Sequence, residues 1–132
     1  MNPWLHGRIG EELIIAENIF SALPETEQKA AYDRLYVCYL VLDMQEQGLT
    51  RLDSIRDILE ECFRKSATKN GYGRKAHNIL RRWGLRPDFN GICTLRKYVE
   101  RLDYFTSEKN HVFLMVDPNV AYAAMGLERR HA

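Results

Sequence analysis

The 132-residue sequence predicts a mainly α fold with one short β-hairpin. Apolar residues recur at helical spacing through most of the chain, and glycine or proline separates successive helical stretches. One compact apolar stretch, residues 111–116, lacks this spacing. The hydrophobic content of 45% and the charged content of 28% are ordinary for a soluble globular chain. A chain of this length can bury a core without disulfide or metal support, so we predict one domain over residues 1–132.

Residues 8–48 are predicted to form a helical hairpin. An apolar stripe at spacings of three and four indicates a first helix over residues 10–23. Pro24 suits the first turn of a second helix, which should run to about Gln47 and stop at Gly48. The middle of this second helix is apolar on all sides, which is typical of a helix surrounded by neighbours.

Residues 50–116 are predicted to contain three more helices and the hairpin. Thr50 and Asp53 form an N-cap signal, residues 66–73 indicate a loop, and residues 86–91 are typical of a turn. The three helices that these features separate are expected to begin after Thr50, at Arg74 and at Cys93, and to end near Phe63, Trp83 and Leu102.

The β-hairpin is predicted from the segment His111–Val116, which is short, apolar and followed by proline. A lone strand is not stable, and Tyr104–Thr106 is the nearest candidate partner. Asp117 and Pro118 favour a helix start, so the C-terminal subregion 117–132 should hold a last helix.

This order of three helices and a hairpin resembles a winged-helix domain of the helix-turn-helix type over residues 52–116. The run from Leu95 to Phe105 carries most of the likeness. The resemblance implies that the helix at 74–83 supports a recognition helix at 93–102, which would enter the major groove of DNA. It also implies that residues 104–116 form the wing, which would touch the DNA backbone.

Charge is distributed unevenly along the chain. The 25 residues from Phe63 to Pro87 contain five arginines, three lysines and no acidic residue. The 51 residues from Glu11 to Glu61 contain twelve acidic and four basic residues. The formal net charge of +1 therefore hides a strongly basic segment beside a strongly acidic one. An anionic partner responds to local potential, so this contrast favours a binding function.

The function that this pattern favours is non-catalytic, regulatory binding of nucleic acid. Basic side chains would neutralise phosphates, and one aromatic side chain in the basic loop would stack on a base. The candidate residues are Lys65, Lys69, Tyr72, Arg74, Lys75, Arg81, Arg82, Arg86, Arg96, Lys97, Arg101 and Lys109. The plain alternative is a solvated basic surface that pairs in part with the acidic segment of the same molecule.

A protein partner is the other binding class. Acid-rich helices could cover a basic toxin or nuclease, as small immunity proteins and inhibitors do, and electrostatic complementarity would select the partner. The candidate residues are Glu11, Glu12, Glu17, Glu25, Glu27, Asp33, Asp43 and Glu46. A homodimer formed through the apolar second helix also stays open.

Neither catalysis nor metal binding is indicated. The four histidines form no metal-ligand spacing with one another or with the cysteines. The glycine-containing run 71–75 lacks the spacing of a phosphate-binding loop. We therefore expect no enzymatic activity, no cofactor and no metal.

The three cysteines, Cys38, Cys62 and Cys93, are odd in number and widely spaced, which favours a reducing compartment. The longest apolar stretch has eight residues, whereas a membrane-spanning helix needs about 20. The N-terminal residues do not resemble a secretory signal. We expect a cytoplasmic protein without a membrane partner.

Overall fold

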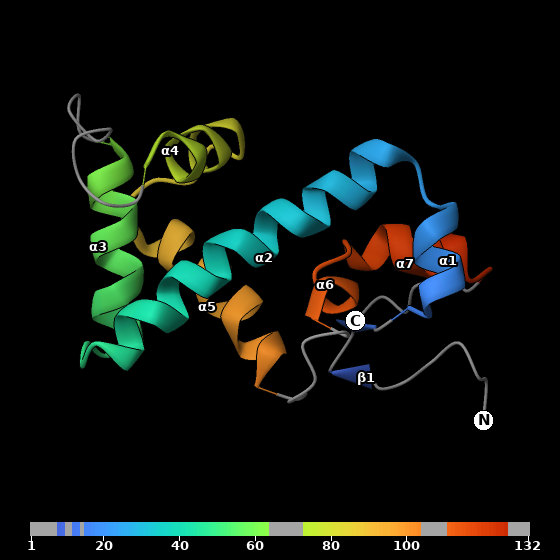
Figure 1. The fold of residues 1–132 in the computed structure, drawn as a ribbon, viewed down its shortest axis with the longest axis horizontal. Coiled ribbons are helices and arrows are strands. Elements are labelled where there is room, and N and C mark those ends of the chain that lie inside the picture. Colours follow the sequence, from blue (N-terminus) through green and yellow to red (C-terminus); the bar gives the residue numbers. More distant parts are fainter. Residues whose placement is uncertain (1–7, 10–11, 14, 64–72, 104–110, 127–132) are drawn as a thin grey trace. The chain divides into compact units, whose positions relative to one another are not determined.

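The structure is a computed structural model, and it describes residues 8–9, 12–13, 15–63, 73–103 and 111–126. It is mainly helical, as predicted, and its elements can be followed in Figure 1. In chain order they are β1 (Arg8–Ile9), β2 (Glu12–Leu13), α1 (Glu17–Ala22), α2 (Glu25–Glu46), α3 (Arg51–Phe63), α4 (Gly73–Arg82), α5 (Phe89–Leu102), α6 (His111–Leu114) and α7 (Pro118–Ala124).

The chain divides into two compact units. One unit consists of Met1–Leu35 together with Arg101–Ala132, and the other consists of Tyr36–Glu100. Helices α2 and α5 each contain residues of both units. The single domain over residues 1–132 stays a prediction.

The first unit begins with two short antiparallel strands, in which Arg8 pairs with Leu13 and Ile9 pairs with Glu12. The predicted helix over residues 10–23 is therefore wrong in its first half, because α1 begins only at Glu17. Ile9, which pairs with Glu12, is β-branched, and such residues favour extended backbone once a pairing partner exists.

The predicted strand at His111–Val116 is also wrong, because His111–Leu114 forms the one-turn helix α6. Two arginine side chains bind backbone carbonyl oxygens here. The Nη1 group of Arg34 donates to the carbonyl oxygen of Met115 at 2.8 Å, and that of Arg101 donates to the carbonyl oxygen of Leu114 at 3.3 Å. These carbonyl groups are thus satisfied without a neighbouring strand. The expected partner strand, Tyr104–Thr106, lies outside the described residues.

The last helix, α7, starts as predicted. Asp117 is its N-cap, and the carboxylate accepts a hydrogen bond from the backbone N–H of Asn119 at 2.8 Å. Pro118 occupies the first turn, where its missing N–H costs nothing. In this unit the buried Phe20 pairs with the half-buried Phe113, and their ring centroids lie 5.3 Å apart.

Helix α2 confirms the predicted long helix. It ends at Glu46, two residues before Gly48, which has a φ of +106°. Buried side chains occur in both halves of the helix, as its apolar character predicts: Ala31, Leu35, Val37, Cys38, Val41 and Met44.

Helix α3 confirms the predicted N-cap at Thr50. The Thr50 hydroxyl accepts a hydrogen bond from the backbone N–H of Asp53 at 3.1 Å. The helix buries Ile55, Ile58 and Leu59 in the core of the second unit.

Helices α4 and α5 complete the second unit. Helix α4 contacts α3, and Figure 1 shows the two side by side. The rings of Trp83, just after α4, and Tyr98, on α5, meet edge to face with centroids 6.3 Å apart. Helix α5 begins at Phe89, earlier than predicted, because the Asp88 carboxylate accepts a hydrogen bond from the backbone N–H of Gly91 at 2.9 Å. Part of the predicted turn at 86–91 is therefore the first turn of a capped helix.

The winged-helix resemblance stays a prediction, although the C-terminal part of its expected wing is helical. The predicted loop at 66–73 falls mostly outside the described residues.

Candidate nucleic-acid interface

Helix α4 places four bases on one exposed side. Its side chains at Ala76, Ile79 and Leu80 are buried, whereas all four bases are exposed: Arg74, Lys75, Arg81 and Arg82. With 3.6 residues per turn, these four positions fall within about a third of the helix circumference. The same 3.6-residue period that builds the core therefore collects the bases opposite it. We call these four residues the basic face of α4.

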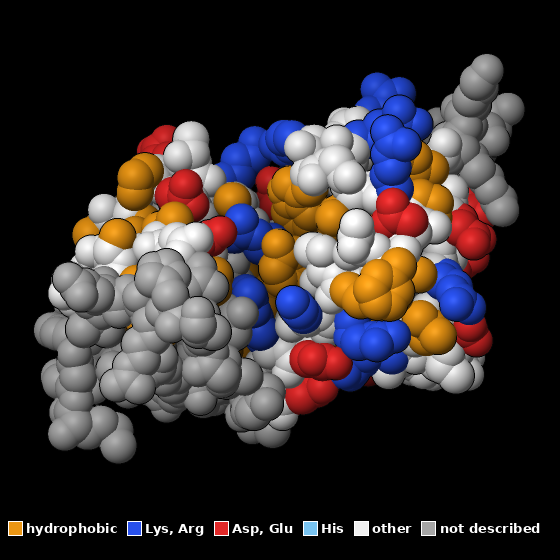
Figure 2. All heavy atoms as spheres, turned by 180° about the vertical axis from the view of Figure 1, so that it is seen from behind, with side chains coloured by type: hydrophobic (Ala, Val, Ile, Leu, Met, Phe, Trp, Pro, Cys, Tyr) orange, Lys and Arg blue, Asp and Glu red, His pale blue; other side chains and the backbone are white. Residues whose placement is uncertain are grey.

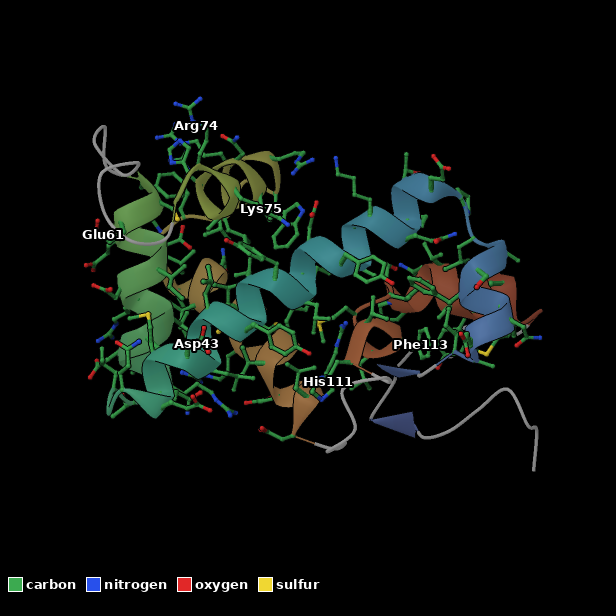
Figure 3. All side chains as sticks on the ribbon, in the orientation of Figure 1. Asp43, Glu61, Arg74, Lys75, His111 and Phe113 are labelled. Carbon is green, nitrogen blue, oxygen red and sulfur yellow. The ribbon has the colours of Figure 1, made fainter. Side chains whose placement is uncertain are left out.

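Two members of the basic face also contact aromatic rings. The Lys75 Nζ atom lies 4.4 Å from the centroid of the Tyr36 ring. The Arg81 guanidinium carbon lies 5.2 Å from the centroid of the Phe63 ring. Such cation–π contacts hold a side chain in place without neutralising its charge. Figure 3 shows that Arg74, in contrast, points away from the helices.

Three further predicted bases are exposed in the same unit. Arg86 lies between α4 and α5, and Arg96 and Lys97 lie on the exposed side of α5. Glu100 is also exposed and lies one turn after both α5 bases, so it weakens the local positive potential. The ring of Trp83, just after α4, contacts the ring of Tyr98 on α5. Each of these residues is directly preceded in the sequence by a basic residue, Arg82 before Trp83 and Lys97 before Tyr98.

The basic side chains do not form one uninterrupted patch on the face that Figure 2 shows. In Figure 2, Lys and Arg side chains on the exposed surface are separated in places by acidic and hydrophobic ones. The basic face of α4 is therefore the best defined group among the predicted binding residues, because one helix holds all four of its members.

Arg101, one of the predicted nucleic-acid-binding residues, does not face solvent. Its side chain is only 6% exposed and donates to the carbonyl oxygen of Leu114. Arg101 lies two residues after the buried Val99 and directly before the buried Leu102, at the edge of the apolar stripe of α5. Four other candidates, Lys65, Lys69, Tyr72 and Lys109, lie outside the described residues.

The acidic candidates have different environments. Asp33 is only 7% exposed, so its carboxylate does not belong to an exposed acidic face as predicted. Glu17 and Glu25 are exposed in the first unit, Asp43 and Glu46 are exposed in the second, and Glu27 is half-buried. Glu11 and the side chain of Glu12 lie outside the described part of the chain.

Sequence reasoning missed Phe89 as a surface residue. The ring is 79% exposed at the first residue of α5. Helical spacing explains the exposure only once α5 is known to begin at Phe89, because this residue precedes Leu95 by six positions and so stands off the helical stripe that contains Leu95, Val99 and Leu102. The sequence interpretation assigned Phe89 to a turn and did not apply this test.

The thiol groups in the second unit include one that is poorly suited to nucleophilic chemistry. The pKa of Cys62 is raised to about 11, chiefly by burial and also by the charge of Glu61, while the charge of Arg81 opposes both effects. Within the described residues, no group of three or more His, Cys, Asp and Glu side chains is placed to hold a metal ion. Among the helices described, none has the length and apolar character needed to cross a membrane.

Comparison with known proteins does not assign the chain to a family: no protein-family model, no curated protein and no solved structure matches it.

Proposed function

We propose that this protein is a non-catalytic, regulatory nucleic-acid-binding protein, and that it binds through the basic face of α4 together with Arg86, Arg96 and Lys97. The observation that carries the proposal is the exposure of all four bases on the side of α4 opposite its buried side chains. Bases held in this way can neutralise successive phosphates and release their condensed counterions.

The charge pattern of α4 supports a ligand and not merely a solvated surface. Arg74 and Lys75 occupy its first turn, where the positive end of the helix dipole disfavours cations, and no acidic residue is present there. Isolated helices favour acidic residues in the first turn and basic residues in the last turn. A bound polyanion would relieve this repulsion, so the unfavourable arrangement is consistent with a binding role.

Binding to nucleic acid is tested with two variants of equal charge change. The test variant carries Arg74→Ala and Arg81→Ala, on the basic face. The matched control carries Lys29→Ala and Arg56→Ala, two exposed bases on α2 and α3. Affinity for mixed-sequence DNA and RNA, both single-stranded and duplex, is measured between about 50 and 200 mM salt, a range over which phosphate contacts change affinity strongly.

We expect wild-type affinity to fall with salt, and the test variant to lose both affinity and salt dependence. Two lost phosphate contacts should reduce the slope of log affinity against log salt by about 1.8 on duplex DNA or about 1.4 on a single strand. The control should keep the wild-type slope. Equal losses in both variants would indicate a nonspecific effect of net charge and contradict the proposed interface.

No detectable binding to any of these nucleic acids at low salt would reject the proposal. The alternative would then be a small immunity protein or inhibitor that binds a basic protein through its acidic helices. That alternative predicts binding to a basic protein partner, which substitution of the exposed Asp43 and Glu46 should weaken.

A further inference from the structure

The exposed Phe89 is close in sequence to two of the predicted phosphate-binding residues of the second unit, Arg86 and Arg96. Arg86 precedes it by three residues and is exposed. Arg96 follows it by seven residues, which places it about 10 Å along the helix axis and within about 20° of the same direction. The ring and both flanking arginine side chains are therefore exposed on one short stretch of the chain, residues 86–96, and the ring shares one side of α5 with Arg96.

The position of Phe89 is held by the cap of α5. The Asp88 carboxylate accepts a hydrogen bond from the backbone N–H of Gly91, three residues into the turn. Phe89 is thus the first residue of a capped helix, and its backbone is ordered before any ligand binds. A backbone that is already ordered reduces the conformational entropy lost when the ring binds a ligand.

A large exposed aromatic ring near exposed arginine side chains is typical of proteins that bind single-stranded nucleic acid. Phe89 is far more exposed than Tyr32 and Leu49, the other large hydrophobic residues with exposed side chains in the described part of the chain. Proteins that bind single strands combine basic groups along the backbone with aromatic rings on which bases stack. A duplex keeps its bases stacked on one another, so an exposed phenyl ring gains little from it.

We infer that the ligand is single-stranded nucleic acid, and that Phe89 stacks on an unpaired base while Arg86 and Arg96 contact the flanking phosphates. This inference rests on the proposed function and narrows it to one class of nucleic acid. Phe89 has no polar group, so it would not distinguish bases by hydrogen bonding, and sequence preference at this position should be weak.

The test compares binding of a 12-nucleotide mixed-sequence single strand with binding of the matching 12-base-pair duplex. Phe89→Ala removes the ring, Phe89→Leu keeps apolar bulk without an aromatic face, and Phe89→Tyr keeps the aromatic face. Leu49→Ala is the matched control, because Leu49 is an exposed apolar residue of the same unit. Circular dichroism checks that each variant keeps the wild-type helix content.

We expect Phe89→Ala and Phe89→Leu to weaken single-strand binding by roughly 5- to 100-fold. Phe89→Tyr and Leu49→Ala should bind within about twofold of wild type, since neither removes a stacking ring. Duplex binding should be weaker than single-strand binding and should respond little to any of the four substitutions. A Phe89→Trp variant should also show quenched fluorescence, relative to wild type, when the single strand binds.

Three outcomes would overturn the inference. One is salt-dependent single-strand binding that needs Arg74 and Arg81 but is unchanged in Phe89→Ala, which leaves the proposed function intact. Another is tighter binding of the duplex. The third is a change in oligomeric state of Phe89→Ala without a change in binding, which would assign the ring to self-association. Absence of all binding at low salt would reject the proposed function itself, and the inference with it.

Discussion

The guanidinium group of Arg101, on α5, donates a hydrogen bond to the backbone carbonyl of Leu114, at the end of α6, at 3.3 Å. Both residues are buried. A positively charged side chain that the sequence assigns to phosphate contact therefore stabilises the folded chain instead.

Substituting Arg101 should affect stability, whereas substituting Arg96 should affect binding. Arg101→Ala leaves the buried Leu114 carbonyl without this donor, and we expect a loss of about 1–3 kcal/mol in the free energy of unfolding. Arg96 is exposed on the same helix, so Arg96→Ala should change stability by less than about 0.5 kcal/mol. Urea unfolding monitored by circular dichroism measures both. A stable Arg101→Ala variant with reduced nucleic-acid affinity would contradict this assignment.

Removing the cap of α5 should destabilise the second unit. Asp88→Ala deletes the acceptor for the Gly91 N–H, and we expect a loss of about 1 kcal/mol in the free energy of unfolding. Asp88→Asn keeps a side-chain oxygen that can accept the same hydrogen bond, so it should lose much less. Chemical denaturation of the three proteins at neutral pH distinguishes these cases. Equal losses for Ala and Asn would show that the carboxylate charge matters more than the hydrogen bond.

Gly91 should not tolerate a methyl group. A Cβ atom at this position would fall on the carbonyl oxygen of Arg86, so the backbone of the 86–91 turn would have to move. We expect Gly91→Ala to cost about 1–3 kcal/mol, despite the higher helix propensity of alanine. Asn90→Ala is the control, because Asn90 is exposed in the same turn. A Gly91→Ala protein as stable as Asn90→Ala would show that the chain has room at this point.

The three thiols should react at different rates. Burial raises the pKa of Cys62 to about 11, so at pH 8 roughly a thousandth of this thiol is the reactive thiolate. Cys38 and Cys62 are buried and Cys93 is half-buried. A disulfide reagent should therefore modify one thiol quickly in the native protein and all three after unfolding. Cys93→Ser should abolish the fast phase, and a fast phase that instead disappears in Cys62→Ser would contradict the burial of Cys62.

The same pKa shift makes stability depend on pH. An unfolded Cys62 would ionise near its usual pKa of 9.0, whereas the folded protein keeps the proton until about pH 11. The unfolded state thus binds fewer protons in this interval, so the free energy of unfolding should fall as pH rises from about 9 to about 11. Cys62→Ser should show a shallower fall in this interval, measured by thermal unfolding at each pH. Parallel curves for the two proteins would contradict the shift.

The sequence predicts a helix well where an apolar stripe at helical spacing is bounded by a capping residue or by a glycine. Thr50 caps α3 with its own hydroxyl, and Asp117 caps α7 in the same way. Gly48 and Gly84 both have positive φ after the helices that they follow. These signals act within one turn of the chain, so no knowledge of distant residues is needed to read them.

The basic face of α4 was also visible in the sequence. Arg74, Lys75, Arg81 and Arg82 are exposed because the spacing of Ala76, Ile79 and Leu80 determines which side of the helix is buried. The burial of Arg101 and the exposure of Phe89 could not be predicted from helical spacing in the same way. Phe89 is the first residue of α5 and Arg101 is the last but one, and burial at a helix end depends on which segment packs against that end.

The amino-acid sequence by itself determined a mainly α chain, the limits of α2 and α3 and the side of α4 that carries positive charge, because helical periodicity and capping are local. Only the tertiary structure decided that His111–Leu114 is a helix, that Arg101 is buried and that Phe89 is exposed. A short apolar run suits a strand or a buried helix equally, and the choice depends on what binds its backbone. Here the donors come from two other helices, since Arg34 lies on α2 and Arg101 lies on α5.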